Sequence, residues 1–302
     1  MNTKPDHMKH LKSSYRDLHR LFSQILTVRE LAEPLASFER DHPVGRVRAF
    51  MVERDYDLVG VREEGVTTGY ARRDRLTGER LADCMEPIHE QEVLDESEPL
   101  STALARLSAG RWVFVSFLGT PSGFVTRGDL QKAPMRMWLF GLISLFEMQL
   151  LRWVRDAYPD GSWAPLLKAN RLEGAEKVFA SRKRANDATD LADCLQLCDK
   201  GTLFLKSPDL RKALSDQAKE HRGSLSATGW ESFVRATTAL RDQIAHSSSI
   251  SSDAWPEIVE LVQRIEKFME VLEATSPPLC KTPESTLTIQ SEEIEPDACD
   301  QP

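Results

Sequence analysis

The sequence predicts an α+β N-terminal part followed by an all-α helical bundle. Between residues 27 and 133, short apolar runs with strand-like alternation are separated by short helical patterns and by turn-forming glycines. From Pro134 to residue 275, apolar residues recur at helical spacing and no strand pattern interrupts them. Residues 276–302 are rich in Pro, Ser, Thr and acids, and we expect this acidic tail to be disordered.

Composition and charge limit what the protein can bind. The 302 residues are 41% hydrophobic and carry a formal net charge of −8, and the tail has six acids against one lysine. Without a polybasic arm, any contact with RNA has to be local. The cysteines lack zinc-site spacing, so no metal is expected, and Cys194 and Cys198 are interpreted as core residues. No signal peptide is recognisable, which predicts a cytoplasmic protein.

The N-terminal elements follow the apolar pattern, and their order recurs after about 55–60 residues, which indicates an internal repeat. In chain order the predicted elements are an entry helix within residues 1–26, a helix over 28–38, strands over 49–53, 57–61 and 67–71 with a turn at 63–65, a strand over 92–94, a helix over 99–108, a strand over 112–118, a turn at 119–123 and a strand over 124–126.

Residues 134–275 are predicted to form an antiparallel helical bundle. Pro134 can start a helix, and Asp253 can cap the last one. The longest apolar run, residues 137–151, contains Glu147 and is too short for a membrane span, so we expect a buried helix and no membrane partner. The predicted helices cover residues 135–158, 171–185, 191–205, 207–221, 228–245 and the segment from Asp253 to Ala274.

The segment Gly123-Phe124-Val125-Thr126-Arg127-Gly128-Asp129-Leu130 resembles the last strand-to-helix turn of a CBS (cystathionine-β-synthase) module. In that family the turn has the pattern Gly-hydrophobic-Val-Thr-x-x-Asp-hydrophobic, and its Thr and Asp often contact the phosphate and ribose of an adenine nucleotide. The resemblance covers residues 27–132 and implies a CBS pair with Thr126 and Asp129 as ligand residues. The chemistry fits, because a carboxylate accepts from ribose hydroxyls and a helix start favours phosphate.

The corresponding turn of the first repeat departs from this pattern. It reads Gly69-Tyr70-Ala71-Arg72-Arg73-Asp74-Arg75-Leu76, so that Arg72 stands in the Thr position and Asp74 comes one place early. A more anionic ligand could meet Arg72 and Arg73 there. The alternative is that both turns only end strands and cap helices.

Arg241-Asp242-Gln243-Ile244-Ala245-His246 lies at the end of a predicted bundle helix, before a serine-rich loop. The segment resembles the Arg-polar-x3-His motif of HEPN domains, helical bundles of many toxin and defence ribonucleases, and the likeness covers residues 134–275. It implies metal-independent RNA cleavage in which His246 transfers protons and Arg241 stabilises the phosphate charge, with Asp242 orienting either one. Residues five apart on a straight helix diverge by about 140°, so the helix must end near Ala245.

The HEPN resemblance also implies a homodimer, because such sites are typically formed by two motifs that face each other across a dyad. Some members use an acid on the first helix, for which Glu147 is the candidate here. The alternative is a buried acid paired with Arg152 or Arg155.

Together these features predict a nucleotide-regulated, metal-independent HEPN endoribonuclease that acts on RNA, possesses no catalytic cofactor and is regulated by an adenine nucleotide. A role in anti-phage or stress defence is expected only by analogy with the family. The alternative is a non-catalytic nucleotide-sensing dimerisation or scaffold protein.

Overall fold

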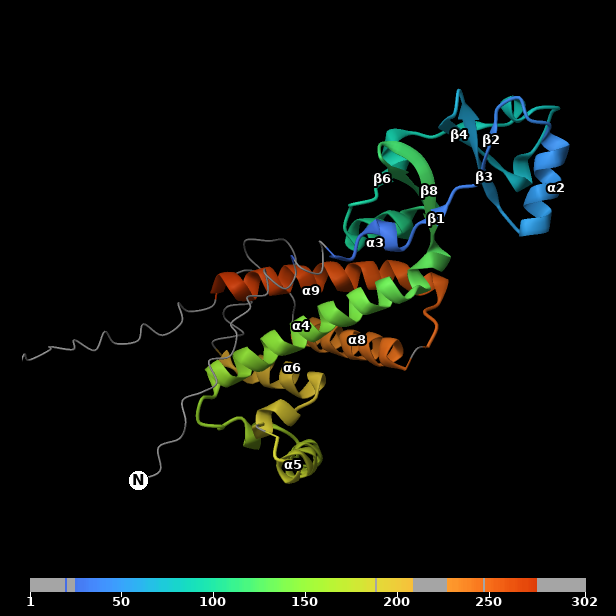
Figure 1. The fold of residues 1–302 in the computed structure, drawn as a ribbon. Helices are drawn as coiled ribbons and strands as arrows, with labels where there is room; N and C mark the ends of the chain where they lie inside the picture. The colour runs from blue at the N-terminus through green and yellow to red at the C-terminus, as the bar shows by residue number, and fades with distance from the viewer. Residues whose placement is uncertain (1–19, 21–24, 188, 209–226, 247, 276–302) are drawn as a thin grey trace, which may run out of the picture.

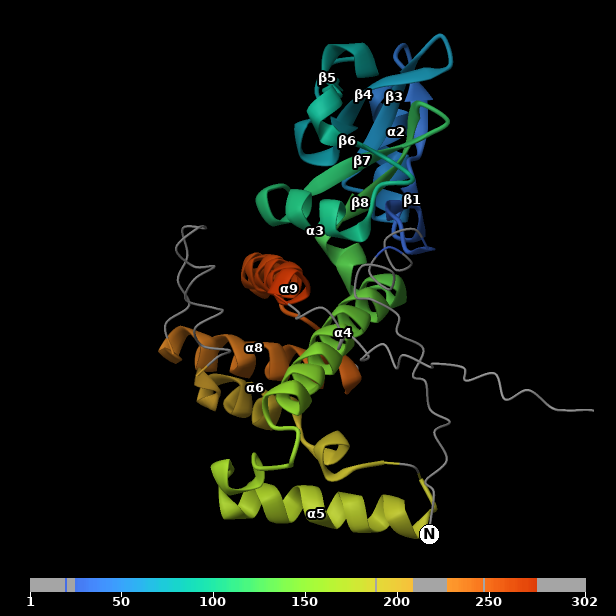
Figure 2. The same ribbon diagram turned by 90° about the vertical axis from the view of Figure 1, so that its left-hand side faces the viewer.

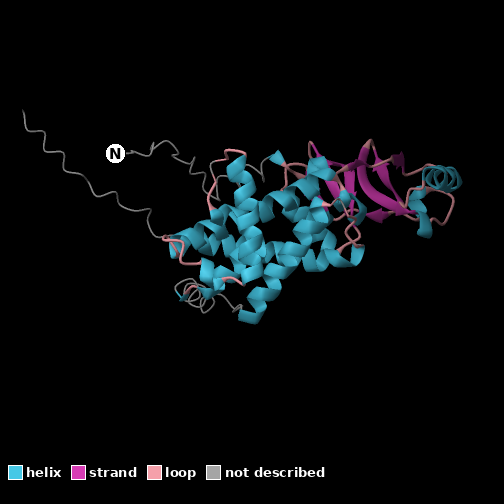
Figure 3. Ribbon diagram, turned by 90° about the horizontal axis from the view of Figure 1, so that it is seen from below, coloured by secondary structure: helices cyan, strands magenta, loops and turns pink. Residues whose placement is uncertain are grey.

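The structure is a computed structural model that describes residue 20 and residues 25–187, 189–208, 227–246 and 248–275. An α/β part with two sheets lies at one end, and a mostly helical remainder lies at the other (Figures 1 and 3). Most of the predicted entry helix within residues 1–26, most of the predicted helix over 207–221 and the whole acidic tail 276–302 lie outside the described residues.

The first sheet forms one module with helix α2 (Val44–Arg54). Its strand order is β2-β3-β4-β5, in which β2 runs parallel to β3, and β3 is antiparallel to β4. Glu64 and Gly65 have φ angles of 52° and 82°, as a two-residue hairpin turn requires. The strands predicted over 57–61 and 67–71 and the turn between them are confirmed. The bounds are β2 (Ser37–Glu39), β3 (Leu58–Glu63), β4 (Val66–Arg72) and β5 (Glu86–Pro87).

The second sheet forms a like module with helix α3 (Leu100–Ala109). Its order is β1-β8-β7-β6, in which β6 runs parallel to β7, and β7 is antiparallel to β8. Both modules therefore follow the order strand, helix, strand, strand and short 3₁₀ helix, which confirms the predicted repeat. The bounds are β1 (Glu33–Pro34), β6 (Val93–Asp95), β7 (Trp112–Phe117), β8 (Thr120–Thr126) and the 3₁₀ helix η5 (Arg127–Gln131).

Two elements predicted between residues 28 and 53 are wrong. The helix predicted over 28–38 is a 3₁₀ turn followed by β1 and β2, because its backbone bonds elsewhere: Val28 N donates to Glu98 O at 2.8 Å and Leu35 N to Ser122 O at 2.9 Å. Pro34 also lacks the N–H that a helix interior needs. The strand predicted over 49–53 lies within α2, where Val44, Val47 and Met51 are buried at helical spacing.

Two further boundaries differ from the prediction. The turn predicted at 119–123 is only Leu118-Gly119, with φ angles of 53° and 80°, and β8 already begins at Thr120. The helix predicted over 191–205 is broken between residues 194 and 197, because Asp190 and Gln196 each open a separate capped helix. The remaining short 3₁₀ helices are η1 (Val28–Glu30), η2 (Arg73–Arg75), η3 (Leu81–Asp83), η4 (Glu90–Glu92), η6 (Ala164–Leu166), η7 (Leu191–Cys194) and η8 (Ser252–Ala254).

Helix α4 (Ala133–Ala157) lies at the centre of the helical part, with α6, α8 and α9 around it (Figure 2). Aromatic rings from all four of these helices form the centre, and Phe204 and Trp230 stack with centroids 4.8 Å apart. Among the described helices, α4 alone is long and apolar enough to cross a membrane, and 56% of its most apolar window is buried inside the protein. The other helices are α5 (Ala169–Arg184), α6 (Leu197–Lys206), α8 (Ala227–Ala245) and α9 (Trp255–Thr275).

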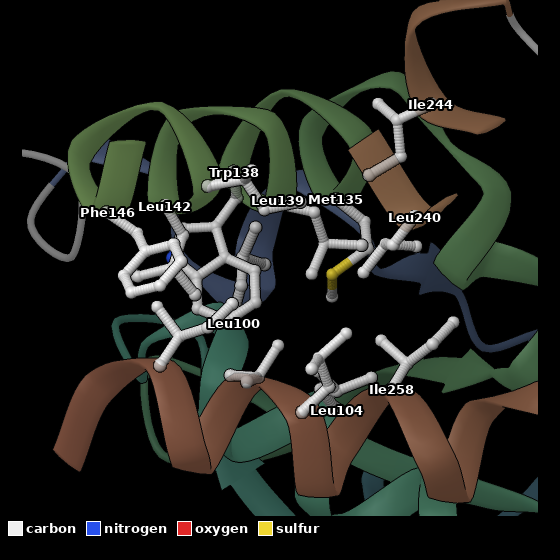
Figure 4. Packing of buried hydrophobic residues seen from close by; sticks show 14 of the residues in the cluster. Leu100, Leu104, Met135, Trp138, Leu139, Leu142, Phe146, Leu240, Ile244 and Ile258 are labelled. Atoms are coloured by element: carbon white, nitrogen blue, oxygen red, sulfur yellow. The ribbon is translucent and has the colours of Figure 1, made fainter. Parts of the chain in front are cut away.

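One hydrophobic core joins the second module to the helices. Leu100 and Leu104 of α3 pack in the same cluster as Trp138 of α4, Ile244 of α8 and Ile258 of α9 (Figure 4). The first module has a separate core, formed by residues of α2, β3, β4 and the segments that follow β4. A small cluster that contains Tyr70 and Phe114 lies between the two modules.

Candidate functional site

The two modules enclose a cleft that brings together all four predicted ligand residues. Thr126 and Asp129 come from the turn that begins at the end of β8, and Arg72 and Asp74 come from the corresponding turn at the end of β4. Its volume is about 740 Å³. The turns are far apart in the sequence but adjacent here because β4 and β8 lie side by side. The other lining residues are Glu33, Asp55, Tyr56, Asp57, Leu58, Arg73, Arg111, Trp112, Phe124, Arg127 and Gly128.

The Asp129 carboxylate holds the second turn together. Its Oδ2 accepts from Thr126 N at 2.7 Å and from Thr126 Oγ1 at 2.8 Å, which caps η5. Its Oδ1 lies 2.9 Å from Lys132 Nζ, and Lys132 also donates to Leu31 O at 2.7 Å. A ligand that recruits Asp129 must therefore compete with Thr126 and Lys132.

The first turn places a guanidinium over an aromatic ring. Arg72 Nη2 lies 2.6 Å from Asp74 Oδ2, and the Arg72 guanidinium carbon lies 5.6 Å from the centroid of the Trp112 ring. Arg73 is paired with Asp55 and Asp57 at 2.9 and 2.6 Å. An anionic ligand that binds Arg72 and Arg73 must therefore compete with the acids that already pair with these two residues.

Arg127 brings a cation to the same cleft. Its Nε and Nη2 donate to the carbonyls of Leu107, Gly110 and Ser108 at 2.8 to 3.2 Å, at the C-terminal end of α3. Carbonyl partners fix the guanidinium without neutralising it, and the Arg127 cation complements the negative end of the α3 helix dipole. Arg111 adds an exposed cation at the rim.

The contact between the modules includes a buried phenol. Burial raises the pKa of Tyr70 to about 12, helped by a hydrogen bond of 3.0 Å in which Tyr70 Oη donates to Glu86 Oε2. The Tyr70 ring packs against Phe114 with centroids 5.2 Å apart. The modules therefore meet through an aromatic contact whose phenol stays neutral below very alkaline pH.

The second candidate site is on α8, where Arg241 lies in a charge cluster with Glu147 of α4. Arg241 Nε and Nη2 donate to Asp242 Oδ1 at 3.1 and 2.8 Å, and Arg241 Nη1 lies 3.6 Å from Glu147 Oε2. Partial burial lowers the pKa of the Arg241 guanidinium, but the hydrogen bond and charge of Asp242 raise it above its usual value. Arg241 therefore stays charged.

Glu147 is a partner of two cations, Lys200 and Arg241, and neither is Arg152 or Arg155, the partners considered for a purely structural acid. Its Oε1 accepts from Lys200 Nζ at 2.7 Å, and the Lys200 side chain is only 6% exposed. Arg155 instead pairs with Asp190 and Asp193. Sequence reasoning missed Lys200; the signal was a charged Asp199-Lys200 pair inside an otherwise apolar helical stretch.

His246 lies just beyond the end of α8, with an exposed side chain. The helix ends at Ala245, as the predicted site required, and His246 N donates to Asp242 O at 3.0 Å. Arg241, Asp242 and Glu147 are in contact, but no hydrogen bond or ion pair joins the His246 ring to these described residues. One chain thus supplies a charged Arg and a separate, exposed imidazole.

The helical part has a further cavity and a thiol close to Arg241. The cavity lies between α6 and α8, measures about 540 Å³ and is lined by Cys198 and Asp242. Burial raises the pKa of the Cys198 thiol, and Arg171 Nη2 lies 2.8 Å from its sulfur. Within the described ranges, no group of three or more His, Cys, Asp or Glu residues could hold a metal ion.

No family model and no curated protein matches this sequence. Among solved structures, the N-terminal part is similar to the CBS domain of a bacterial CNNM/CorC family Mg²⁺ transporter in complex with ATP, with 21% identity over 38% of this chain and 92% of that chain, and a TM-score of 0.31. It is also similar to CBSX2 in complex with AMP, with 20% identity over 37% of this chain and 97% of that chain, and a TM-score of 0.33.

A third similar structure is the CBS domain of a membrane protein from Sphaerobacter thermophilus, with 15% identity over 38% of this chain and 91% of that chain, and a TM-score of 0.32. At these identities and TM-scores the likeness says nothing about ligand or activity in this chain. The chemistry of the cleft has to be inferred from the residues that line it.

Proposed function

We propose that this chain is a nucleotide-regulated, metal-independent endoribonuclease. The two α/β modules act as a CBS-type pair that binds an adenine nucleotide, and the Arg241–His246 segment of a HEPN-type bundle cleaves RNA. The observation that carries the proposal is the cleft, because residues of two distant turns line it together. The adenine preference is taken from the resemblance of the turn at Thr126 and Asp129 to CBS modules.

The lining of the cleft suits a nucleotide. Arg127 and Arg111 offer positive charge for a phosphate, and the helix η5 begins beside them. The rings of Trp112 and Phe124 offer flat apolar surfaces for a base. Asp129 offers a carboxylate to ribose hydroxyls once Lys132 or Thr126 is displaced.

In the proposed reaction, the 2′-hydroxyl of RNA attacks the adjacent phosphorus, and the bond from phosphorus to the 5′-oxygen breaks. One His246 imidazole accepts the proton of the 2′-hydroxyl, and a second copy, supplied by a homodimer, protonates the leaving 5′-oxygen. Arg241 stabilises the charge that develops on the phosphate, while Glu147 and Asp242 orient the Arg241 guanidinium. Support for this assignment comes from the exposed His246 and from a guanidinium that stays charged.

A non-catalytic nucleotide sensor is the second candidate function. One observation favours it, namely that Asp242 and Glu147 already compensate the charge of Arg241. In that case the helical part would transmit nucleotide binding to a partner protein and would not cleave RNA.

The two candidates are separated by incubating the purified protein with total RNA in EDTA, with and without AMP or ATP. The endoribonuclease proposal expects cleavage that falls by about 10²–10⁴-fold in His246→Ala. His89→Ala, which alters an exposed histidine of the α/β part, is the matched control and should cleave like the wild type. No cleavage under any nucleotide would instead favour the sensor, and full activity of His246→Ala would exclude the proposed mechanism.

A further inference from the structure

Two side chains, Gln131 and Arg136, come from the segment that follows the cleft. They bond to residues on both sides of His246, between positions 243 and 250, and residues 243–250 are called the His246 loop. Ile250 N donates to Gln131 Oε1 at 3.1 Å, and Gln131 Nε2 donates back to Ile250 O. One amide side chain therefore satisfies both backbone groups of Ile250, as a neighbouring strand would. The Ile250 side chain is buried in the core shared by the second module and the helices, so this contact fixes the end of the loop.

Arg136 of α4 fixes the start of the same loop. Its Nη2 donates to Ile244 O at 2.9 Å and to Gln243 O at 3.3 Å, and its Nη1 donates to Ser248 O at 3.0 Å. The last carbonyls of a helix have no partner within the helix, and a cation there also matches the helix dipole. Arg136 therefore caps α8 at the turn that carries His246.

Both side chains belong to the chain segment that leaves the cleft. Gln131 is the last residue of η5, the 3₁₀ helix that Asp129 caps, and Arg136 lies in the first turn of the helix that follows. Lys132, between them, pairs with Asp129 and donates to Leu31 O. A ligand that changes the contacts of Asp129 thus acts on a turn two residues from Gln131.

We propose that Gln131 and Arg136 are positioning residues that set the place of the His246 loop and transmit occupancy of the cleft to it. The coupling rests on the proposed function, since it needs a ligand in the cleft and a role for His246. The positioning does not, because it can be measured without either. A ligand can shift the loop only if the protein binds it with different affinity in two positions of the loop. The contact between Gln131 and Ile250 is what links the position of the loop to the turn at Asp129.

The experiment is hydrogen–deuterium exchange of the full-length protein, read over residues 243–250. In the absence of nucleotide, Gln131→Ala and Arg136→Met should each exchange about tenfold faster there, because hydrogen bonds that hold the loop are lost. The matched controls are Gln149→Ala and Arg152→Met, which alter residues of α4 outside the contact and should exchange like the wild type. Unchanged exchange in Gln131→Ala and Arg136→Met overturns the proposal.

The coupling is tested by adding AMP or ATP at a concentration that shifts the melting temperature of the wild type. Exchange over residues 243–250 should then change in the wild type but not in Gln131→Ala, although both proteins bind the nucleotide. A response retained in Gln131→Ala, or a wild-type loop that does not respond to bound nucleotide, refutes the coupling. In the RNA assay, both variants should lose kcat with KM for RNA unchanged, since the loop and not the RNA surface has moved.

These readouts separate the two proposals. Faster exchange in both variants of a protein that cleaves no RNA supports the positioning, while the endoribonuclease proposal fails. Normal exchange in both variants of a protein that does cleave RNA overturns the positioning and leaves the endoribonuclease proposal standing.

Discussion

Replacing Glu147 by Gln tests the charge cluster under Arg241. Glu147 Oε1 lies 2.7 Å from Lys200 Nζ, and the Lys200 and Glu147 side chains are only 6% and 22% exposed. Glutamine keeps an oxygen within reach of Lys200 but carries no charge. The substitution therefore leaves a buried ammonium without its counter-ion and removes one of the two acids beside Arg241.

The expected loss of stability follows from burial. Removing one partner of a buried ion pair typically costs about 3–5 kcal/mol. The hydrogen bond that glutamine retains and the partial exposure of Glu147 reduce the cost of this change to the lower limit of that range or just below it, at about 2–3 kcal/mol. The contact with Arg241 adds little, because it spans 3.6 Å and Asp242 remains. For a chain of this size the melting temperature should fall by roughly 3–6 °C.

Thermal and urea unfolding of Glu147→Gln measure this cost. Glu260→Gln is the matched control, since it removes an exposed acid paired with Arg264 on the surface of α9 and should shift the melting temperature by about 1 °C at most. The double variant Glu147→Gln/Lys200→Met should recover at least half of the loss, because no charge is then buried alone. Glu147→Gln melting together with Glu260→Gln would show that Lys200 does not depend on Glu147.

Two further predictions concern the α/β part. Asp129→Asn should lose the melting-temperature increase that AMP or ATP gives the wild type. Its stability without nucleotide should fall by about 1 kcal/mol, because the cap of η5 and the ion pair with Lys132 are weakened. An unchanged response to nucleotide would show that Asp129 does not contact the ligand. The pKa of Tyr70 is raised to about 12, so the fold favours the neutral phenol, and this stabilisation should be complete below pH 10 and disappear as the pH rises through 12. The difference between the absorbance titrations of the wild type and Tyr70→Phe at about 295 nm isolates this group, and a midpoint near pH 10, the ordinary tyrosine value, would contradict the burial argument.

Elements whose partners lie nearby in sequence could be predicted. Strands β3 and β4 are short, largely apolar or β-branched runs on either side of Glu64-Gly65, so their hairpin is encoded locally. The segment at 28–38 could not be predicted in this way, because its apolar spacing resembles a helix while its backbone partners, Glu98 and Ser122, lie far along the chain. Hydrogen bonds to these distant residues hold the segment in a non-helical conformation, although its local apolar pattern favours a helix.

The same distinction holds for the candidate sites. Thr126 and Asp129 could be picked out because one short turn contains both, and the motif at Arg241 is equally local. The Lys200 contact with Glu147 joins residues 53 positions apart, and the Gln131 contact with Ile250 joins residues 119 apart. Asp199-Lys200 is marked as unusual by its charge in an apolar helical stretch, but nothing in the local sequence names Glu147 or Ile250 as the distant partner.

The distribution of the hydrophobic cores determines which module can transmit a signal. The first module has its own core and meets the second mainly through the small cluster around Tyr70 and Phe114, so it can shift as a unit without disturbing the helices. The second module shares one core with α4, α8 and α9, so its last turn cannot move without changing contacts in the bundle. In the proposed coupling, the turn at Asp129 is therefore the part of the cleft that can carry a response to Ile250 and the end of α8.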